Sequence, residues 1–281
     1  MKNILLSTLC VLIFASFAPI FAQKMTAEDV IAKHLESIGT KENRNALKDL
    51  TVAGKVSYTQ LRTGGGGADG NAILASEGTK SLLGMNLSTP KYPLEKIGYD
   101  GNKLRVAFIL PGTRSPLGNF FLSYDSIFKE GLFGGILSTG WSLNNLEARK
   151  AKVDFDGKRK VDGKEMYVLS YLPKSGSDVS IKLFFDTVTF QHLRTEYKRT
   201  ISPGQGATVD ASARQRESRQ TLVEEFSANK NEKGLNLPHS YRLYLAFDGI
   251  AGTSEYEWKF EFSQFFFNQQ LDAKSFNIET K

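Results

Sequence analysis

Residues 255–262 have the sequence Glu-Tyr-Glu-Trp-Lys-Phe-Glu-Phe, an unbroken alternation of charged and aromatic side chains. Successive side chains of a β-strand point to opposite faces, so the aromatic residues share one face and the charged residues share the other. This alternation predicts a strand with one buried side and one side in water, which is typical of an antiparallel sheet. The segment therefore indicates a mainly β fold.

The same period of two recurs through most of the chain. It is clear at residues 52–58, 179–185 and 241–247, where apolar side chains alternate with polar or smaller ones. Further strand candidates are residues 72–82, 93–99, 103–109, 151–156, 165–172, 193–200 and 219–227. Asp-Gly turn sequences separate several of these segments, at residues 100–102, 156–158 and 162–164. The pattern predicts an antiparallel meander of roughly ten strands.

A sheet with that many strands curls, because strands twist and long free edges invite pairing with other chains. A single antiparallel β-barrel of this kind can close, or it can stay half-open with an N-terminal helix and a helical lid over its concave face. The helix is predicted at residues 26–38, where Thr26 and Asp29 form a capping box. Its apolar face comprises Ile31, Leu35 and Ile38. Gly39 then suits a left-handed helix end, and a short helical turn is expected near residues 45–50.

Residues 117–146 interrupt the alternation and are rich in Phe, Leu and Gly. Ser123 is expected to cap a helix across residues 127–133, whereas the glycines oppose helix throughout the segment. Because a segment this apolar cannot be left exposed to water, we expect it to pack against the concave face of the sheet. Two interpretations remain open, because the segment either forms a lid over a ligand cavity or simply completes the core. As a lid, its ligand-binding residues are Phe120, Phe121, Phe128, Leu132, Phe133, Ile136, Leu137 and Trp141.

The first residues have the order of a secretory signal: a short positive start, an apolar run and a small residue at the cut. We predict a signal peptide at residues 1–22, with cleavage after Ala22. Residues 23–281 are then expected to form one barrel domain. The alternative is an uncleaved membrane anchor, which the short apolar run and Pro19 disfavour.

The only cysteine, Cys10, lies in this leader. It follows Leu9 instead of the small residue that a lipoprotein signal needs, so no lipidation is expected. We expect export to the periplasm, free or associated with the envelope, and no transmembrane segment after the signal is removed.

Charge and motifs exclude several classes of function. The formal net charge of +6 at pH 7 suits anionic surfaces, but export argues against a nucleic-acid partner. His34, His192 and His239 do not have the spacing of metal ligands, so no metal and no other cofactor is expected. The chain has no nucleophile elbow and no phosphate-binding loop with a Lys-Ser/Thr ending. Glu224 and Glu225 are neighbours on a predicted strand, so they should face opposite sides and not share a proton. We therefore predict no catalytic residue and a non-enzymatic protein.

The order of these parts resembles the bacterial outer-membrane lipoprotein-sorting (LolA/LolB-like) superfamily. The resemblance lies in residues 27–39, 50–56, 99–104, 185–193, 234–239 and 267–272, together with Phe276. It implies a half-open barrel with a helical lid over an apolar cavity that receives lipid or the acyl chains of lipoproteins. The extra loops at residues 64–67 and 202–214 depart from the compact carriers of that superfamily.

Three hypotheses follow. The first is a periplasmic, non-enzymatic binder or carrier of lipid or lipoprotein acyl chains in an apolar cavity, acting in transport or as a chaperone. The second is a structural or sensing module of the envelope that binds a protein partner through the edge of the sheet. The third is a periplasmic hydrolase with a scattered site. The first is preferred, because burial of each methylene contributes about 0.8 kcal/mol and a long chain needs few polar contacts.

Overall fold

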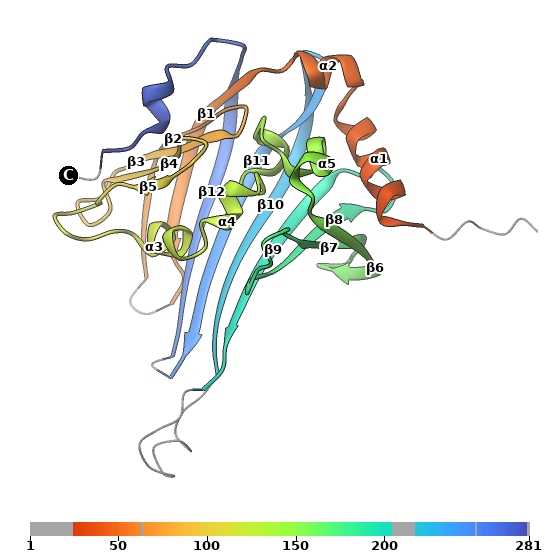
Figure 1. The fold of residues 1–281 in the computed structure, drawn as a ribbon. Coiled ribbons are helices and arrows are strands. Elements are labelled where there is room, and N and C mark those ends of the chain that lie inside the picture. Colours follow the sequence, from red (N-terminus) through yellow and green to blue (C-terminus); the bar gives the residue numbers. More distant parts are fainter. Residues whose placement is uncertain (1–24, 63–64, 204–216, 251, 280–281) are drawn as a thin grey trace, which may run out of the picture.

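The computed structural model describes residues 25–62, 65–203, 217–250 and 252–279 (Figure 1). They form one antiparallel sheet of 12 strands that does not close. The predicted mainly β, half-open barrel is therefore confirmed, with more strands than expected. The strands are β1 (Asp49–Gln60), β2 (Gly66–Glu77), β3 (Lys80–Leu87), β4 (Leu94–Tyr99), β5 (Leu104–Val106), β6 (Lys152–Val161), β7 (Lys164–Leu172), β8 (Ser180–Asp186), β9 (His192–Ile201), β10 (Ser218–Glu232), β11 (Leu235–Gly249) and β12 (Gly252–Phe267).

The first and last strands of the chain are neighbours in the middle of the sheet. The strand order is β5-β4-β3-β2-β1-β12-β11-β10-β9-β8-β7-β6, and Tyr58 on β1 lies opposite Trp258 on β12. Strands β5 and β6 are therefore the two ends of the sheet, although they follow one another in sequence. The predicted signal peptide at residues 1–22 and most of the loop at 202–214 lie outside the described residues.

The N-terminal helix α1 (Ala27–Ile38) begins with the predicted capping box of Thr26 and Asp29. Its buried residues are Ala27, Val30, His34 and Ile38, so the inner face is rotated from the predicted one and Ile31 and Leu35 are only partly buried. Gly39 has φ 153° and ψ −179°, which is not the left-handed helical end expected. The second helix, α2 (Lys41–Ala46), starts earlier than the turn predicted near residues 45–50.

Two expectations about the strands were wrong. Residues 72–82 are not one strand, because the chain turns at Gly78 (φ 57°) between β2 and β3. Residues 156–158 are not a hairpin turn but lie within β6, where the register shifts between Phe155 and Lys158. Gly157 has φ 86° there, so the glycine serves a bulge in a strand that continues.

The concave face of the sheet is covered by the connection between β5 and β6, residues 107–151, which we call the insert (Figure 1). Its elements are α3 (Pro116–Ser123), α4 (Ser126–Lys129), η1 (Gly135–Leu137), η2 (Ser142–Asn145) and α5 (Leu146–Arg149). The predicted helix across residues 127–133 is only partly confirmed, because α4 contains Ile127 and Phe128 but ends before Leu132 and Phe133. Ser115 caps α3, Ser123 ends it, and Gly131 at φ 64° turns the chain before Leu132. As predicted, the glycines keep every helix of the insert short.

A short C-terminal segment covers part of the outer face of the sheet. Residues Phe276 and Ile278, in and just after η3 (Ala273–Phe276), are buried against Ala75 and Leu82. A Cβ at Gly98 would lie 2.6 Å from Cγ1 of Ile278, so glycine on β4 makes room for this segment.

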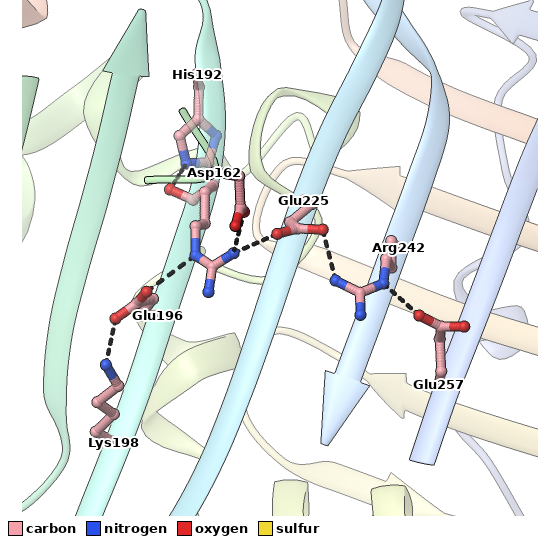
Figure 2. A network of polar contacts seen from close by, with 8 residues as sticks. Asp162, His192, Glu196, Lys198, Glu225, Arg242 and Glu257 are labelled. Atoms are coloured by element: carbon pink, nitrogen blue, oxygen red, sulfur yellow. Dashed lines mark hydrogen bonds and ion pairs between the residues drawn. The ribbon is translucent and has the colours of Figure 1, made fainter. Parts of the chain in front are cut away.

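The outer face of β9–β12 carries a ladder of ion pairs, which Figure 2 shows across adjacent strands. Arg194 on β9 binds Glu225 on β10 and, at 2.9 Å, Glu196. Arg242 on β11 binds Glu225 at 2.7 Å and Glu257 on β12 at 2.6 Å. The central glutamate thus joins two arginines, and the ladder stabilises the register of four neighbouring strands.

Replacing Arg242 with methionine should lower the free energy of unfolding by about 1 kcal/mol, because two partly screened ion pairs are lost while the apolar stem is kept. The loss should shrink at high salt. Urea unfolding at low and high ionic strength measures both effects. Arg62→Met is the control, since the Arg62 side chain is 61% exposed and its loss should have little effect. Equal losses in both variants would contradict a stabilising role for the ladder.

Candidate functional site

All eight sequence-predicted ligand-binding residues lie in the insert and are buried against the concave face. The most exposed of them, Ile136, is 6% exposed. The others are Phe120, Phe121, Phe128, Leu132, Phe133, Leu137 and Trp141, at 0–2%. The rings of Phe128 and Phe133 are stacked with centroids 4.6 Å apart. The insert therefore covers the sheet and also fills the core in this conformation, so a ligand reaches these residues only if the insert moves.

Trp141 joins the insert to two histidines. Its Nε1 donates to Nε2 of His34 at 3.1 Å, and Nδ1 of His34 donates to the carbonyl of Phe190 at 3.1 Å. The Trp141 ring also stacks on His192, with centroids 4.9 Å apart. Burial lowers the pKa of His34 to about 4 and lowers that of His192 well below its ordinary range. Both rings are therefore neutral at pH 7, and neutral His34 accepts the indole hydrogen bond.

Glu224 on β10, the strand next to that of His192, also binds the insert. Its carboxylate is fully buried and accepts hydrogen bonds from the hydroxyls of Tyr197 at 2.7 Å and Tyr241 at 2.6 Å. It also accepts from the backbone amide of Gly134 in the insert at 2.8 Å. Burial raises the pKa of Glu224 to about 7, although the three hydrogen bonds oppose that shift. A buried acid with a neutral-range pKa is an unusual group and a marker of functional sites.

A second buried acid, Glu95 on β4, lies near the start of the insert. The hydroxyl of Tyr92 donates to Oε2 of Glu95 at 2.5 Å, and burial raises the pKa of Glu95 to about 7. Among the described residues, the other carboxyl oxygen of Glu95, Oε1, has no hydrogen-bond partner. Buried acids from both halves of the sheet therefore contact the region where the insert is held.

A pocket of about 440 Å³ opens beside the insert, and we call it the mouth pocket. Its aromatic and apolar walls come from β1, β12, the loop before β4 and the beginning of the insert. The lining residues are Tyr58, Gln60, Gly65, Gly66, Gly67, Thr89, Lys91, Tyr92, Ile109, Pro116 and Tyr256. Ile109 and Pro116 belong to the insert, so the pocket borders the start of the insert. Tyr58, Tyr92, Ile109 and Tyr256 also pack into the main core cluster, which contains Phe120 and Phe133.

Aromatic rings lie in series in the wall of the mouth pocket and, at the fully buried Trp258, behind it. The Tyr58 ring is 5.0 Å from that of Tyr92 and 5.4 Å from that of Trp258, and the Trp258 ring is 6.3 Å from that of Tyr256. Burial raises the pKa of Tyr58 to about 12, so its phenol is neutral. The buried Nε1 of Trp258 has no hydrogen-bond partner among the residues that the structure describes. The lining thus combines aromatic rings with polar side chains, Gln60, Thr89 and Lys91 among them, which suits the junction between the apolar and polar parts of a ligand.

Two other hollows in the described part of the chain are larger than the mouth pocket, and the larger of them is a different kind of surface. It measures about 540 Å³ and lies on the outer face of β1 and β2, where Lys55, Asp69 and Glu261 line it. It has no aromatic wall and no contact with the insert, so the mouth pocket is the better candidate site.

The sequence predictions missed the two buried acids and the pairing of His34 with His192. Glu224 and Glu225 do face opposite sides of β10, as predicted, with Glu224 inward. A signal was present, because Leu222, Glu224 and Phe226 alternate on one face and the acid is the polar member of an apolar row. No such signal marks His34, whose neighbour comes from a distant strand.

Within the described ranges, no group of three or more His, Cys, Asp or Glu side chains has an arrangement that could hold a metal ion. His239 lies apart from the other histidines, with Nε2 3.0 Å from Glu232. Among these same residues, no helix has the length and apolar character needed to cross a membrane.

No protein-family model and no curated protein matches the chain. Solved structures do match. A LolA superfamily protein from Nitrosomonas europaea is 14% identical, and the match covers 90% of this chain and 97% of that chain with a TM-score of 0.46. A DUF1329 family protein from Desulfovibrio piger is 12% identical, with coverages of 89% and 96% and a TM-score of 0.39.

A domain from Vibrio parahaemolyticus, described as an outer membrane lipoprotein-sorting protein, is 12% identical, with coverages of 88% and 97% and a TM-score of 0.38. The superfamily that the sequence resembles is therefore among the structures matched. At these identities the likeness concerns the fold alone.

Proposed function

We propose that this protein is a non-enzymatic binder or carrier of an amphiphile, with lipid or the acyl chain of a lipoprotein as its cargo. The observation that supports this function is the mouth pocket, whose aromatic wall lies next to the apolar region beneath the insert. The polar end of the cargo would lie among Tyr58, Tyr92 and Lys91, and the apolar chain would pass under the insert. The resemblance of the sequence to lipoprotein-sorting proteins implies the same class of cargo.

The cargo would replace contacts that the insert now makes. Each methylene transferred from water contributes about 0.8 kcal/mol, so a long acyl chain can offset the loss of aromatic contacts when the insert is displaced. The eight predicted residues of the insert would then contact the chain. We place this activity in residues 23–281, in the periplasm, after removal of residues 1–22 as a signal peptide.

The alternative is an envelope module that binds a protein partner through the edge of the sheet. The longer end strand, β6, is poorly suited to this, because lysines at positions 152, 158 and 160 and a bulge discourage pairing with another strand. The acyl-chain function therefore has the stronger structural support.

The test is capture of a fluorescent long-chain fatty acid by the protein, combined with mass spectrometry of an organic extract of the protein purified without detergent. Tyr58→Ala should weaken capture about tenfold, because an aromatic ring is lost from the wall of the pocket. Tyr244→Ala is the matched control, since Tyr244 faces outward on β11 and bonds Glu255. Equal affinities for the two variants, with an extract free of lipid, would refute the proposed function.

A further inference from the structure

Glu224 is placed where the sheet and the insert meet, and it accepts the amide hydrogen of Gly134. We propose that Glu224 is a positioning residue that holds the insert over the concave face, and that its proton sets how readily the insert opens. The proposal depends on the proposed function in one respect only: the insert is taken to open in order to admit an amphiphile. The opening itself is a property of the protein without cargo.

The backbone around Gly134 makes this contact specific. Gly134 and Gly135 have φ 77° and 51°, which favour glycine. A Cβ at Gly135 would lie 2.9 Å from the Phe226 ring and 3.0 Å from Nδ1 of His192. The insert therefore approaches β9 and β10 closely at Gly135, and the carboxylate of Glu224 binds the amide of the preceding residue, Gly134.

The groups that face Glu224 do not include a counterion. Tyr197 comes from β9 and Tyr241 from β11, and both donate neutral hydroxyls. The insert contributes an amide, and neutral His192 on β9 lies beside Gly135. In the part of the chain that the structure describes, no lysine or arginine forms an ion pair with Glu224. The closed insert therefore favours the protonated acid, and opening it to water favours the charged one.

The direction of the pH effect follows from this. In the closed state the pKa of Glu224 is about 7, above its ordinary value of 4.5, so the closed state binds the proton more tightly. The proton of Glu224 therefore stabilises the closed insert fully at pH values below 4.5, the ordinary pKa of the group, and this stabilisation is lost as the pH rises through 7. His34 and His192 act in the opposite direction at acidic pH, because opening would let them charge. A comparison with a variant that changes Glu224 alone removes their contribution.

That variant is Glu224→Gln, which keeps the shape and stays uncharged at every pH. Hydrogen exchange of the peptide around Gly134 gives the opening constant without any ligand. Between pH 5 and pH 8, the ratio of the wild-type to the Glu224→Gln opening constant should rise on the order of tenfold to a hundredfold. Glu225→Gln is the matched control, since Glu225 faces outward on the same strand and binds Arg194 and Arg242. The proposal would be overturned if the ratio of the wild-type to the Glu224→Gln opening constant did not change with pH. It would also be overturned if the ratio of the wild-type to the Glu225→Gln opening constant changed by the same factor.

A second variant keeps the proposal testable if Glu224→Gln fails to fold. Tyr197→Phe removes a donor that favours the charged carboxylate, so the pH at which the insert opens should move upward. An unmoved transition would contradict the role of Glu224. Both measurements use the protein without cargo. A negative result here is therefore distinguishable from a negative result in the fatty-acid capture experiment.

Discussion

Phe133→Ala is expected to lower the free energy of unfolding by about 4 kcal/mol, which is one of the largest effects of a single substitution in this chain. The Phe133 ring is 2% exposed, stacks on Phe128 at 4.6 Å and meets Phe121 edge-on at 5.1 Å. Truncation removes these contacts and leaves a cavity between the insert and the sheet, which short, glycine-linked helices fill poorly. Urea unfolding followed by circular dichroism measures the loss.

Phe266→Ala is the control for this measurement. Phe266 is likewise a phenylalanine, on β12 of the sheet, but its side chain is 43% exposed, so its truncation should cost less than about 1 kcal/mol. If Phe133→Ala were as mild as Phe266→Ala, the insert would not be part of the cooperative core. The loss expected here also means that ligand capture by insert variants must be compared at equal fractions of folded protein.

Locking the insert to the sheet is expected to abolish capture of long-chain amphiphiles, with a loss of more than about tenfold that reduction reverses. The pair Ser76→Cys and Thr139→Cys suits this lock. Oγ of Ser76 on β2 accepts a hydrogen bond from the backbone amide of Thr139 in the insert at 2.9 Å. A disulfide there would hold the insert against the sheet without altering the mouth pocket. Capture before and after reduction by dithiothreitol is the measurement.

Each single-cysteine variant is the control for this lock, because it carries one substitution and forms no internal disulfide. The chain has 1 Cys, Cys10, so no other thiol competes once residues 1–22 are removed. If the oxidised double variant, with its disulfide verified by mass spectrometry, captured the amphiphile as well as the reduced form, the cargo would not pass beneath the insert.

Much of the fold followed from the sequence, because alternation in a strand is a local property. Residues 255–262 and 241–247 show it without interruption, and the structure places both segments in long central strands. The capping box of α1 was equally local. The bulge at Gly157 was not, because an Asp-Gly sequence suits both a turn and a bulge and only pairing with β7 decides between them.

The candidate site was less accessible to sequence reasoning. The apolar residues of the insert were found from composition, and the structure does bring them together. Their local conformation was missed, because the caps at Ser115 and Ser123 look alike in sequence and tertiary packing selects one. The mouth pocket joins Tyr58, Tyr92 and Tyr256 from three distant segments, so no local pattern could indicate it.

The pairing of β1 with β12 also constrains how the chain can fold. Tyr58 and Trp258 meet across the sheet although they are near opposite ends of the sequence, so the central ladder needs one of the longest loop closures available to this chain. Such non-local pairing slows folding. Until β12 is free to pair, β1 and β11 each present an open edge, and both half-sheets are prone to aggregation. Folding of the sheet therefore finishes only once the last strand has been synthesised and released, and a chain truncated before β12 should remain a substrate for chaperones and proteases.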